Sequence, residues 1–229
     1  MLPLALVVFA KHPTAGRVKT RLQPTYTPAQ SAAVQDVFLR HFVRRLAALR
    51  LGQVVIAFDP PDAAAEMAQF AADGEVELLP QVEGDLGCRL CAAAGSLSER
   101  FEQVLMFGVD SPDVPGTYVR KLPRILAKYD AILAPTDDGG FWALGVRRGV
   151  DLERTLAGVE WSSGQEKPQV AANFTAAGYR VGDGDQWSDV DHPADLGALL
   201  ERLSISNADD DRLLRDALRP IVSGEGAAL

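Results

Sequence analysis

Near its amino end the chain reads LALVVFAKHPTAGRVKTRL over residues 4–22, a continuous apolar run followed at once by a basic loop. The apolar run has the length of a strand and shows no alternation, which is typical of a strand that helices cover on both faces. The loop combines Gly16 with the cations Arg17, Lys19 and Arg21. Such a loop can offer backbone N–H groups and positive side chains to a polyphosphate. We therefore expect a central strand that leads directly into a phosphate site.

The basic loop also has a plainer interpretation. It matches neither the Walker A pattern, which needs Gly-Lys-Ser/Thr after four spacer residues, nor the dinucleotide pattern G-x-G-x-x-G. A solvated basic surface explains the loop equally well when it is taken alone. The choice between the two depends on what the rest of the chain brings to the same place.

Strand and helix patterns alternate along the chain. Further strands are expected at 54–58, 76–79, 104–107, 131–134, 141–146 and 179–181. Helices are expected at 28–50, 63–72, 86–99, 118–128, 164–177 and 193–203, the first of them with Thr27 as its N-cap. The alternation predicts an α/β fold, with a mostly parallel central sheet and helices on both faces. We expect one domain over residues 1–203 and a polar C-terminal extension over 204–229, with a short helix near 211–218 and a mobile end.

Composition excludes several classes of function. The chain has 229 residues, 47% of them hydrophobic, and a formal net charge of −8. That charge argues against binding to nucleic acid or to an anionic membrane surface, and no apolar run is long enough to span a bilayer. A cytoplasmic protein is therefore expected. Cys88 and Cys91 form a C-x-x-C pair, but no second pair accompanies them, so we interpret them as structural rather than redox-active or zinc-binding.

Two acidic positions are candidate ligands for Mg²⁺ or Mn²⁺. Asp110 directly follows the apolar strand at 104–107, so it lies at the carboxyl end of a strand, where open α/β sheets bind ligands. Asp191 ends the Asp-Val-Asp motif at 189–191, directly before a helix. Hard divalent cations take carboxylate oxygens together with substrate phosphates. Either aspartate could instead cap the helix that follows it.

Two further motifs are candidates for contacts with a substrate. Asp138 precedes Gly139, Gly140 and Phe141, which places negative charge beside a backbone that a ligand can approach closely, although Asp-Gly is also a strong hairpin-turn signal. Trp161 and Ser162 could position a hydroxylated substrate, or could equally be a buried indole beside a helix cap.

In this order the motifs resemble the DUF2064 family of bacterial glycosyltransferase-like proteins, also described as radical-SAM/selenodomain-associated transferases. The resemblance extends from Val7 to about Leu203. The segments that carry it are 9–13, 16–22, Gln81 with 84–87, 110–112, 138–141, 161–162 and 189–191.

The resemblance implies a single Rossmann-like nucleotide-diphospho-sugar transferase (GT-A) domain. It implies contacts to the nucleotide and its phosphates from Lys11, Gly16, Arg17, Lys19, Arg21 and Asp85. Substrate contacts would come from Gly139, Gly140, Phe141, Trp161 and Ser162. Asp110 and Asp191 would hold the metal ion, because the Asp-x-Asp found in many such enzymes is replaced here by Asp-Ser-Pro at 110–112. Asp110 and Asp138 are the expected catalytic residues, with Asp138 orienting or deprotonating the acceptor.

The leading functional hypothesis is the transfer of a sugar from a nucleotide-diphosphate donor to a small-molecule acceptor, assisted by Mg²⁺ or Mn²⁺. The first alternative is a nucleotidyltransferase that joins a nucleoside triphosphate to a phosphorylated metabolite, since residues 18–22 also resemble the phosphate loop of phospholactate guanylyltransferases. The second is a non-catalytic protein that binds a nucleotide and leaves it intact. No pattern in the sequence indicates the base, the sugar, the acceptor or an oligomeric state.

Overall fold

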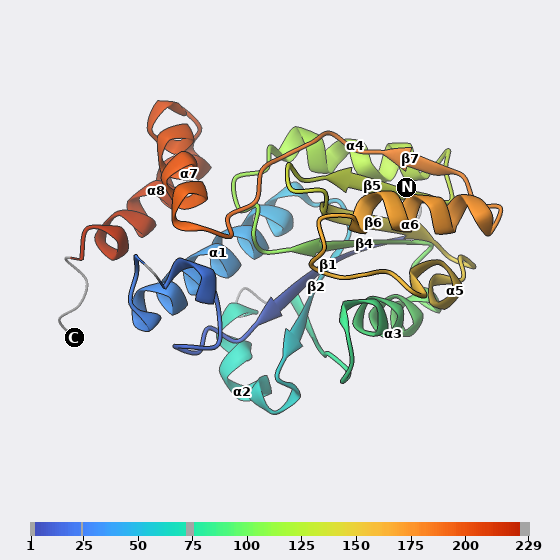
Figure 1. Ribbon diagram of the computed structural model, residues 1–229, viewed down its shortest axis with the longest axis horizontal. Helices are drawn as coiled ribbons and strands as arrows, with labels where there is room; N and C mark the ends of the chain where they lie inside the picture. The colour runs from blue at the N-terminus through green and yellow to red at the C-terminus, as the bar shows by residue number, and fades with distance from the viewer. Residues whose placement is uncertain (1–2, 24, 72–75, 225–229) are drawn as a thin grey trace.

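The strands of the central sheet lie in the order β3-β2-β1-β4-β6-β5-β7 in the computed structural model, which describes residues 3–23, 25–71 and 76–224 (Figure 1). They are β1 (Leu4–Lys11), β2 (Gln53–Asp59), β3 (Val76–Pro80), β4 (Gln103–Gly108), β5 (Ala131–Pro135), β6 (Phe141–Arg147) and β7 (Val181–Asp183). β1 pairs in parallel with both β2 and β4, whereas β6 runs antiparallel to β4 and to β5. The predicted mostly parallel sheet is confirmed, with one reversed strand.

Helices cover both faces of this sheet. They are α1 (Pro28–Leu49), α2 (Ala64–Met67), α3 (Leu86–Ser98), α4 (Gly116–Leu126), α5 (Leu152–Leu156), α6 (Glu166–Ala176), α7 (Pro193–Ile205) and α8 (Asp209–Val222). Successive side chains of β1 point to opposite faces. Leu6 and Val8 belong to a core shared with α1, α2 and α4, whereas Ala5 and Val7 belong to a second core shared with α3, α5 and α6. This double burial explains the unbroken apolar run and confirms the α/β fold.

The start of α1 was predictable from local sequence. The hydroxyl of Thr27 accepts from the Gln30 backbone N–H at 3.2 Å, and the Gln30 side chain accepts from the Thr27 N–H at 2.9 Å. This reciprocal capping box satisfies N–H groups that a helix leaves without partners at its first turn. Pro28 occupies the first helical position, where its missing N–H costs nothing.

Some expected elements differ from those observed. The segment expected as one helix at 63–72 is instead two short 3₁₀ turns on either side of α2, and residues 72–75 lie outside the described part. The strand expected at 179–181 lies at 181–183, because the chain first turns at Gly178 with φ of +87° after α6. α5 was not expected, since a helix of five residues is too short to show a helical period in the sequence. The expected mobile end falls on residues 225–229, also outside the described part.

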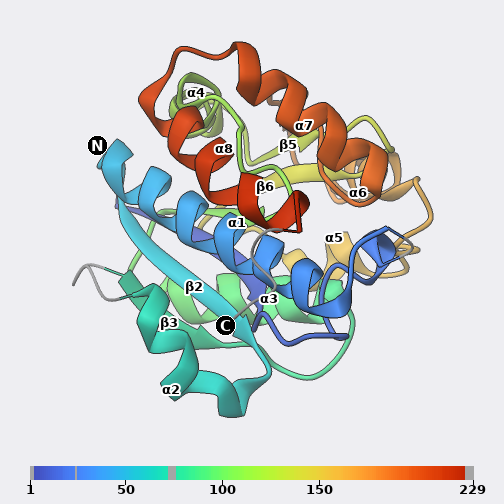
Figure 2. The same cartoon turned by 90° about the vertical axis from the view of Figure 1, so that its left-hand side faces the viewer.

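The last two helices pack against each other and against α1 rather than against the sheet (Figure 2). Leu199 and Leu203 of α7 and Leu214 of α8 form an apolar cluster with Phe38 of α1. Val190, from the segment that precedes α7, is fully buried in the same cluster. The C-terminal helices are thus joined to the core beside the segment that contains Asp191.

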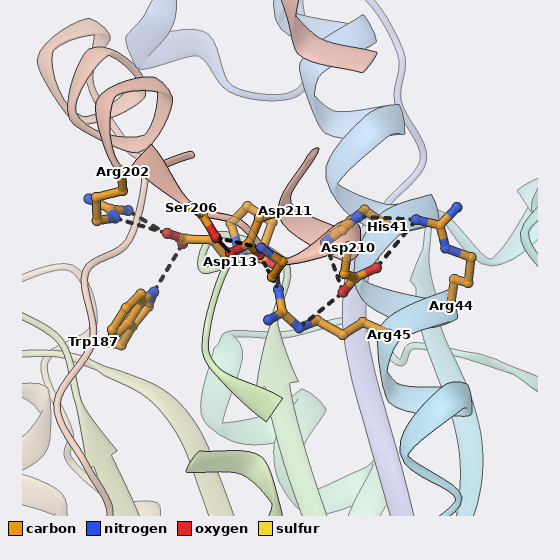
Figure 3. A network of polar contacts seen from close by, with 11 residues as sticks. His41, Arg44, Arg45, Asp113, Trp187, Arg202, Ser206, Asp210 and Asp211 are labelled. Carbon is orange, nitrogen blue, oxygen red and sulfur yellow. Dashed lines mark hydrogen bonds and ion pairs between the residues drawn. The ribbon is translucent and has the colours of Figure 1, made fainter. Parts of the chain in front are cut away.

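His41 lies on α1 beneath α8 and is 4% exposed (Figure 3). Burial, together with the neighbouring Arg45 and Arg44, lowers the pKa of its imidazole to about 4 against the attraction of Asp210. The imidazole Nε2 lies 3.6 Å from a carboxylate oxygen of Asp210, too far for a hydrogen bond. Desolvation therefore outweighs this attraction, and His41 is neutral in the folded protein near pH 7.

This low pKa predicts a loss of stability in mild acid. The unfolded chain takes up the His41 proton near pH 6.5, whereas the folded chain resists it until pH is near 4. The contribution of His41 to the free energy of unfolding is therefore fully present above pH 6.5 and is lost as the pH decreases toward 4. Between pH 8 and pH 5 we expect the free energy of unfolding to fall by about 2 kcal/mol more in the parent protein than in His41→Gln. Urea unfolding at both pH values measures this difference, and equal losses in the two proteins would contradict it.

Candidate functional site

A cavity of about 600 Å³ opens at the carboxyl ends of β1 and β4. These strands are adjacent, and the chain continues from β1 to β2 toward one edge of the sheet and from β4 to β5 toward the other edge. Open α/β sheets bind ligands where the strand order reverses in this way. We call it the strand-end cavity. Among the residues expected to form the site, it is lined by Lys11, Arg17, Lys19, Arg21, Asp110, Ser162 and Asp191. The structure therefore brings the basic loop and both candidate metal ligands to one place.

The basic loop is held by its apolar residues. Val18 is 4% exposed and Leu22 is fully buried, so these two positions fix the loop against the core while the cations between and beside them line the cavity. Gly16 makes the turn with φ of +79°, a conformation that favours glycine, but it does not line the cavity. Lys19 itself adopts a left-handed backbone conformation with φ of 46°.

Lys19 joins the basic loop to both acidic segments. Its ammonium group, on a side chain that is only 5% exposed, forms an ion pair with Asp110 and donates to the backbone carbonyl of Val190. It also lies 5.3 Å from the centre of the Phe38 ring, within range of a cation–π interaction. The backbone N–H of Val190 donates to the Asp110 carbonyl at 2.9 Å. Three segments that are distant in sequence are therefore joined around one cation.

A second ion pair repeats this arrangement at the cavity edge. Arg21 Nη1 lies 2.5 Å from Asp191 Oδ2, and both side chains are partly exposed. Lys11 and Arg17, in contrast, make no ion pair with any residue in the described part of the chain. Of the four expected cations in the cavity, two are thus without an ion pair among the described residues, and two are held by the carboxylates that were expected to bind metal.

The acidic segments create a strongly negative environment around Asp189. Burial, together with repulsion from Asp138, Asp191 and Asp110, raises the pKa of its carboxyl to about 7. Asp189 was part of the recognised Asp-Val-Asp motif, but only Asp191, which directly precedes the helix, was among the expected site residues. The structure shows that both contribute to this environment.

The hairpin turn that contains Asp138 lies beside the cavity without lining it. The Asp138 carboxylate accepts from the Gly140 N–H at 3.0 Å and from the Thr136 hydroxyl. Gly139 has φ of +93°, and a Cβ there would lie 2.0 Å from the carbonyl oxygen of Gly164. The hairpin interpretation is therefore confirmed, and the close approach that glycine permits at position 139 is to the 164 segment of the same chain. A role for Asp138, Gly139 and Gly140 toward a substrate stays a prediction.

The other expected contact residues lie beside the strand-end cavity, near residues that line it. Asp85 caps α3, accepting from the Cys88 N–H at 2.8 Å, and this backbone hydrogen bond holds the pKa of its carboxyl below the usual value. Phe141 packs edge-to-face on Trp161 with ring centres 6.4 Å apart, and Trp161 lies against the first turn of α3 near Gly87. Their expected roles toward nucleotide and substrate also stay predictions. The cavity is also lined by the polar side chains of Gln35, Gln81 and Arg89, which were not among the expected site residues. Gln35 and Gln81 are buried, and only Gln81 belonged to a segment that carried the family resemblance.

The oxygen-rich acidic segments suit a hard divalent cation. Asp110, Asp191 and the Val190 carbonyl provide oxygen atoms only, and a cation near them would relieve the repulsion that raises the pKa of Asp189. Within the described part of the chain, however, no group of three or more acidic, histidine or cysteine side chains is arranged to hold a metal. The residues therefore fit a cation that also takes ligands from a bound phosphate.

The chain has an α/β fold that resembles the folds of nucleotide-diphospho-sugar transferases and cytidylyltransferases. The chain belongs to the DUF2064 family, described as an uncharacterized protein conserved in bacteria, whose model matches residues 42–163. A comparison with curated proteins gives no match. No helix in the described part is long and apolar enough to cross a membrane.

Solved structures share this fold over nearly the whole chain. A presumed nucleotide-diphospho-sugar transferase from Desulfovibrio desulfuricans G20 is 27% identical, with a TM-score of 0.80 and 98% of each chain covered. The CMP:2-keto-3-deoxy-manno-octonic acid synthetase in complex with CTP is 12% identical, with a TM-score of 0.57, 88% of this chain and 98% of that chain covered. Rv0371c of Mycobacterium tuberculosis H37Rv in complex with manganese is 18% identical, with a TM-score of 0.51, 94% of this chain and 98% of that chain covered.

Proposed function

We propose that the protein transfers a sugar from a nucleotide-diphosphate donor to a small-molecule acceptor, with Mg²⁺ or Mn²⁺ bound in the strand-end cavity. The observation that carries this proposal is the meeting of the four expected cations with two carboxylates at the carboxyl ends of β1 and β4. A diphosphate needs positive charge, and a metal bound to it needs oxygen ligands from the protein. Both requirements are met within one cavity.

The cations have two different roles in this proposal. Lys11 and Arg17 have no ion-pair partner among the described residues, so they are free to meet the first phosphate charges. Lys19 and Arg21 are paired with Asp110 and Asp191 before any ligand arrives. A bound diphosphate gives these two cations a new partner and leaves the carboxylates for the metal. Nucleotide and metal are therefore expected to bind with positive cooperativity.

In the reaction, the bond between the anomeric carbon and the diphosphate oxygen breaks, and a bond forms between that carbon and an acceptor hydroxyl oxygen. The hydroxyl proton leaves, and the nucleoside diphosphate is released. Asp110 and Asp191 would hold the metal, which when bound neutralises negative charge that develops on the departing diphosphate. Arg17, Lys19 and Arg21 add fixed positive charge at the same place.

Asp138 is the proposed acceptor-side residue. Its carboxylate accepts hydrogen bonds from Thr136 and Gly140, so its direction is fixed by its own hairpin. A fixed carboxylate is suited to orient an acceptor hydroxyl and to accept its proton.

Nucleotidyl transfer is the second candidate. The likeness of fold to a synthetase in complex with CTP favours it, because the same architecture there holds a free triphosphate. In that reaction a phosphate oxygen of the second substrate would attack the α-phosphorus, and inorganic diphosphate would leave. The cations of the strand-end cavity could stabilise either leaving group, the nucleoside diphosphate or the inorganic diphosphate.

Calorimetric titration of nucleotide-diphospho-sugars and nucleoside triphosphates, each with and without Mn²⁺, separates these candidates. Metal-dependent selection of a nucleotide sugar, followed by release of nucleoside diphosphate with an acceptor, supports sugar transfer. Selection of a triphosphate and release of inorganic diphosphate supports nucleotidyl transfer. Asp110→Asn should lose the metal-dependent part of the binding in either case. Binding of nucleotide that stays intact with every acceptor would reject both reactions.

A further inference from the structure

Asp113 is a buried carboxylate three residues after Asp110, outside the strand-end cavity. Its side chain is 4% exposed and accepts three hydrogen bonds (Figure 3). Trp187 Nε1 donates to it at 3.0 Å, and Arg202 donates from Nε at 2.9 Å and from Nη2 at 3.3 Å. The Arg202 guanidinium also lies 5.7 Å from the centre of the Trp187 ring. None of these residues carried a motif in the sequence.

These three residues lie next to the segments that hold the candidate metal ligands. Asp113 belongs to the connection between β4 and α4, which also contains Asp110. Trp187 belongs to the segment between β7 and α7, which also contains Asp191, and Arg202 lies on α7 itself. The Asp113 carboxylate therefore joins the segment with Asp110 to the segment with Asp191 and to α7.

A second anchor holds the Asp113 segment from the other side. Arg45 of α1, whose side chain is 12% exposed, donates to the Pro112 carbonyl at 3.3 Å. The same guanidinium lies 3.3 Å from Asp210 and 3.3 Å from Asp211 at the start of α8. The segment with Asp110 is thus fixed between α7 on one side and α1 with α8 on the other (Figure 3).

A buried ion pair is a poor means of stabilising a fold. The cost of desolvating the two charges consumes most of their attraction, and apolar side chains of similar volume often stabilise equally well. What such a pair does provide is a fixed geometry, because guanidinium donors and carboxylate acceptors have defined directions. The Asp113 network is therefore better suited to set positions than to add stability.

We propose that Asp113 and Arg202 are positioning residues that fix Asp110 and Asp191 relative to each other for metal and diphosphate binding. This inference rests on the proposed function of the strand-end cavity. Neither residue contacts the cavity, so their effect passes through the two backbone segments. Partners that orient a metal ligand commonly change metal affinity about 10- to 100-fold when they are removed.

The test measures Mn²⁺ affinity in the presence of the nucleotide that the calorimetric panel selects. We expect Asp113→Asn and Arg202→Gln each to weaken Mn²⁺ binding about tenfold. The double variant should be no weaker than either single variant, because both remove the same contact. Nucleotide affinity without metal should stay within about twofold, since the basic loop is untouched. Arg202→Lys, which keeps the charge without the guanidinium fork, should recover part of the loss.

Arg148→Gln is the matched control. Arg148 pairs with Glu102 at 2.6 Å on an exposed surface away from the cavity. Its removal should leave both affinities unchanged. If Asp113→Asn does not fold, Trp187→Phe keeps the aromatic ring, removes one donor to the same carboxylate and should show a smaller loss of Mn²⁺ affinity.

Two outcomes overturn the inference separately from the function. Equal losses of metal affinity and of metal-free nucleotide affinity, or a loss of stability alone, would show that Asp113 has only a structural role. Unchanged Mn²⁺ affinity in folded Asp113→Asn would reject the positioning role outright while the proposed function stands. If the parent protein itself shows no metal-dependent nucleotide binding, the proposed function fails and the positioning role fails with it.

Discussion

Lys19→Met is expected to raise the affinity for Mn²⁺ measured without nucleotide about tenfold, yet to lower turnover with the selected donor at least about a hundredfold. The two effects have opposite signs because Lys19 meets two different partners. Before a ligand binds, its ammonium group is paired with Asp110 and competes with a metal for that carboxylate. In the proposed reaction, the same charge would face the departing diphosphate.

The magnitudes follow from general electrostatics. Removing one fixed donor or charge from a developing anion typically costs about 10²- to 10³-fold in rate. Two unit charges at contact in a partly exposed site interact by roughly 1 to 4 kcal/mol, which spans the expected change in metal affinity. Lys19→Met keeps a chain of similar length over Phe38, so the packing of the loop is preserved.

Lys121→Met is the matched control for this experiment. Lys121 also pairs with an aspartate, Asp185 at 2.9 Å, but does not line the strand-end cavity. Its removal should change neither metal affinity nor turnover. Unchanged metal affinity in Lys19→Met would contradict the competition at Asp110, and unchanged turnover would contradict the role of the basic loop in the reaction.

Gly139→Ala is expected to destabilise the protein by about 3 kcal/mol. Two costs combine at this position. The backbone has φ of +93°, which an alanine adopts only under strain, and the added Cβ would lie 2.0 Å from the Gly164 carbonyl oxygen. The hairpin and the 164 segment must then separate, which also breaks the hydrogen bond from the Lys167 N–H to the Gly139 carbonyl at 3.1 Å.

Gly149→Ala separates these two costs. Gly149 has nearly the same φ, +88°, but its Cβ would meet no atom within 4 Å. Gly149→Ala should therefore destabilise the protein only through its strained backbone conformation, by about 1 kcal/mol. Urea unfolding of both variants measures the difference. Equal losses would mean that the contact between the 139 and 164 segments relaxes freely.

The sequence predicted the parts of the site that depend on strand ends. Asp110 and the basic loop both follow buried strands, and neighbouring parallel strands bring their carboxyl ends to one edge of the sheet. The cavity therefore contains all four expected cations and both expected metal ligands. Asp138 and Phe141 follow a different rule, because Phe141 begins the reversed strand β6 and Asp138 precedes it. Both lie beside the cavity rather than in its lining.

The sequence could not show which charged residues form ion pairs with each other. Lys19 pairs with Asp110 across 91 positions of sequence, and Arg21 pairs with Asp191 across 170. No periodicity specifies such a pair, because each residue has several acidic or basic candidates at the same sheet edge. The Asp113 network was hidden for the same reason, since a lone aspartate beside a proline resembles an ordinary turn residue.

The backbone carbonyl of Val190 completes the contacts of Lys19, and this has a consequence for the order in which the protein is made. The basic loop is synthesised before Asp110, and the segment that contacts both of them is synthesised only later. Until position 190 has been synthesised, Lys19 lacks that carbonyl and Asp110 lacks its backbone partner. The contacts that join the basic loop to the end of β4 are therefore completed only after the segment around position 190 has been synthesised.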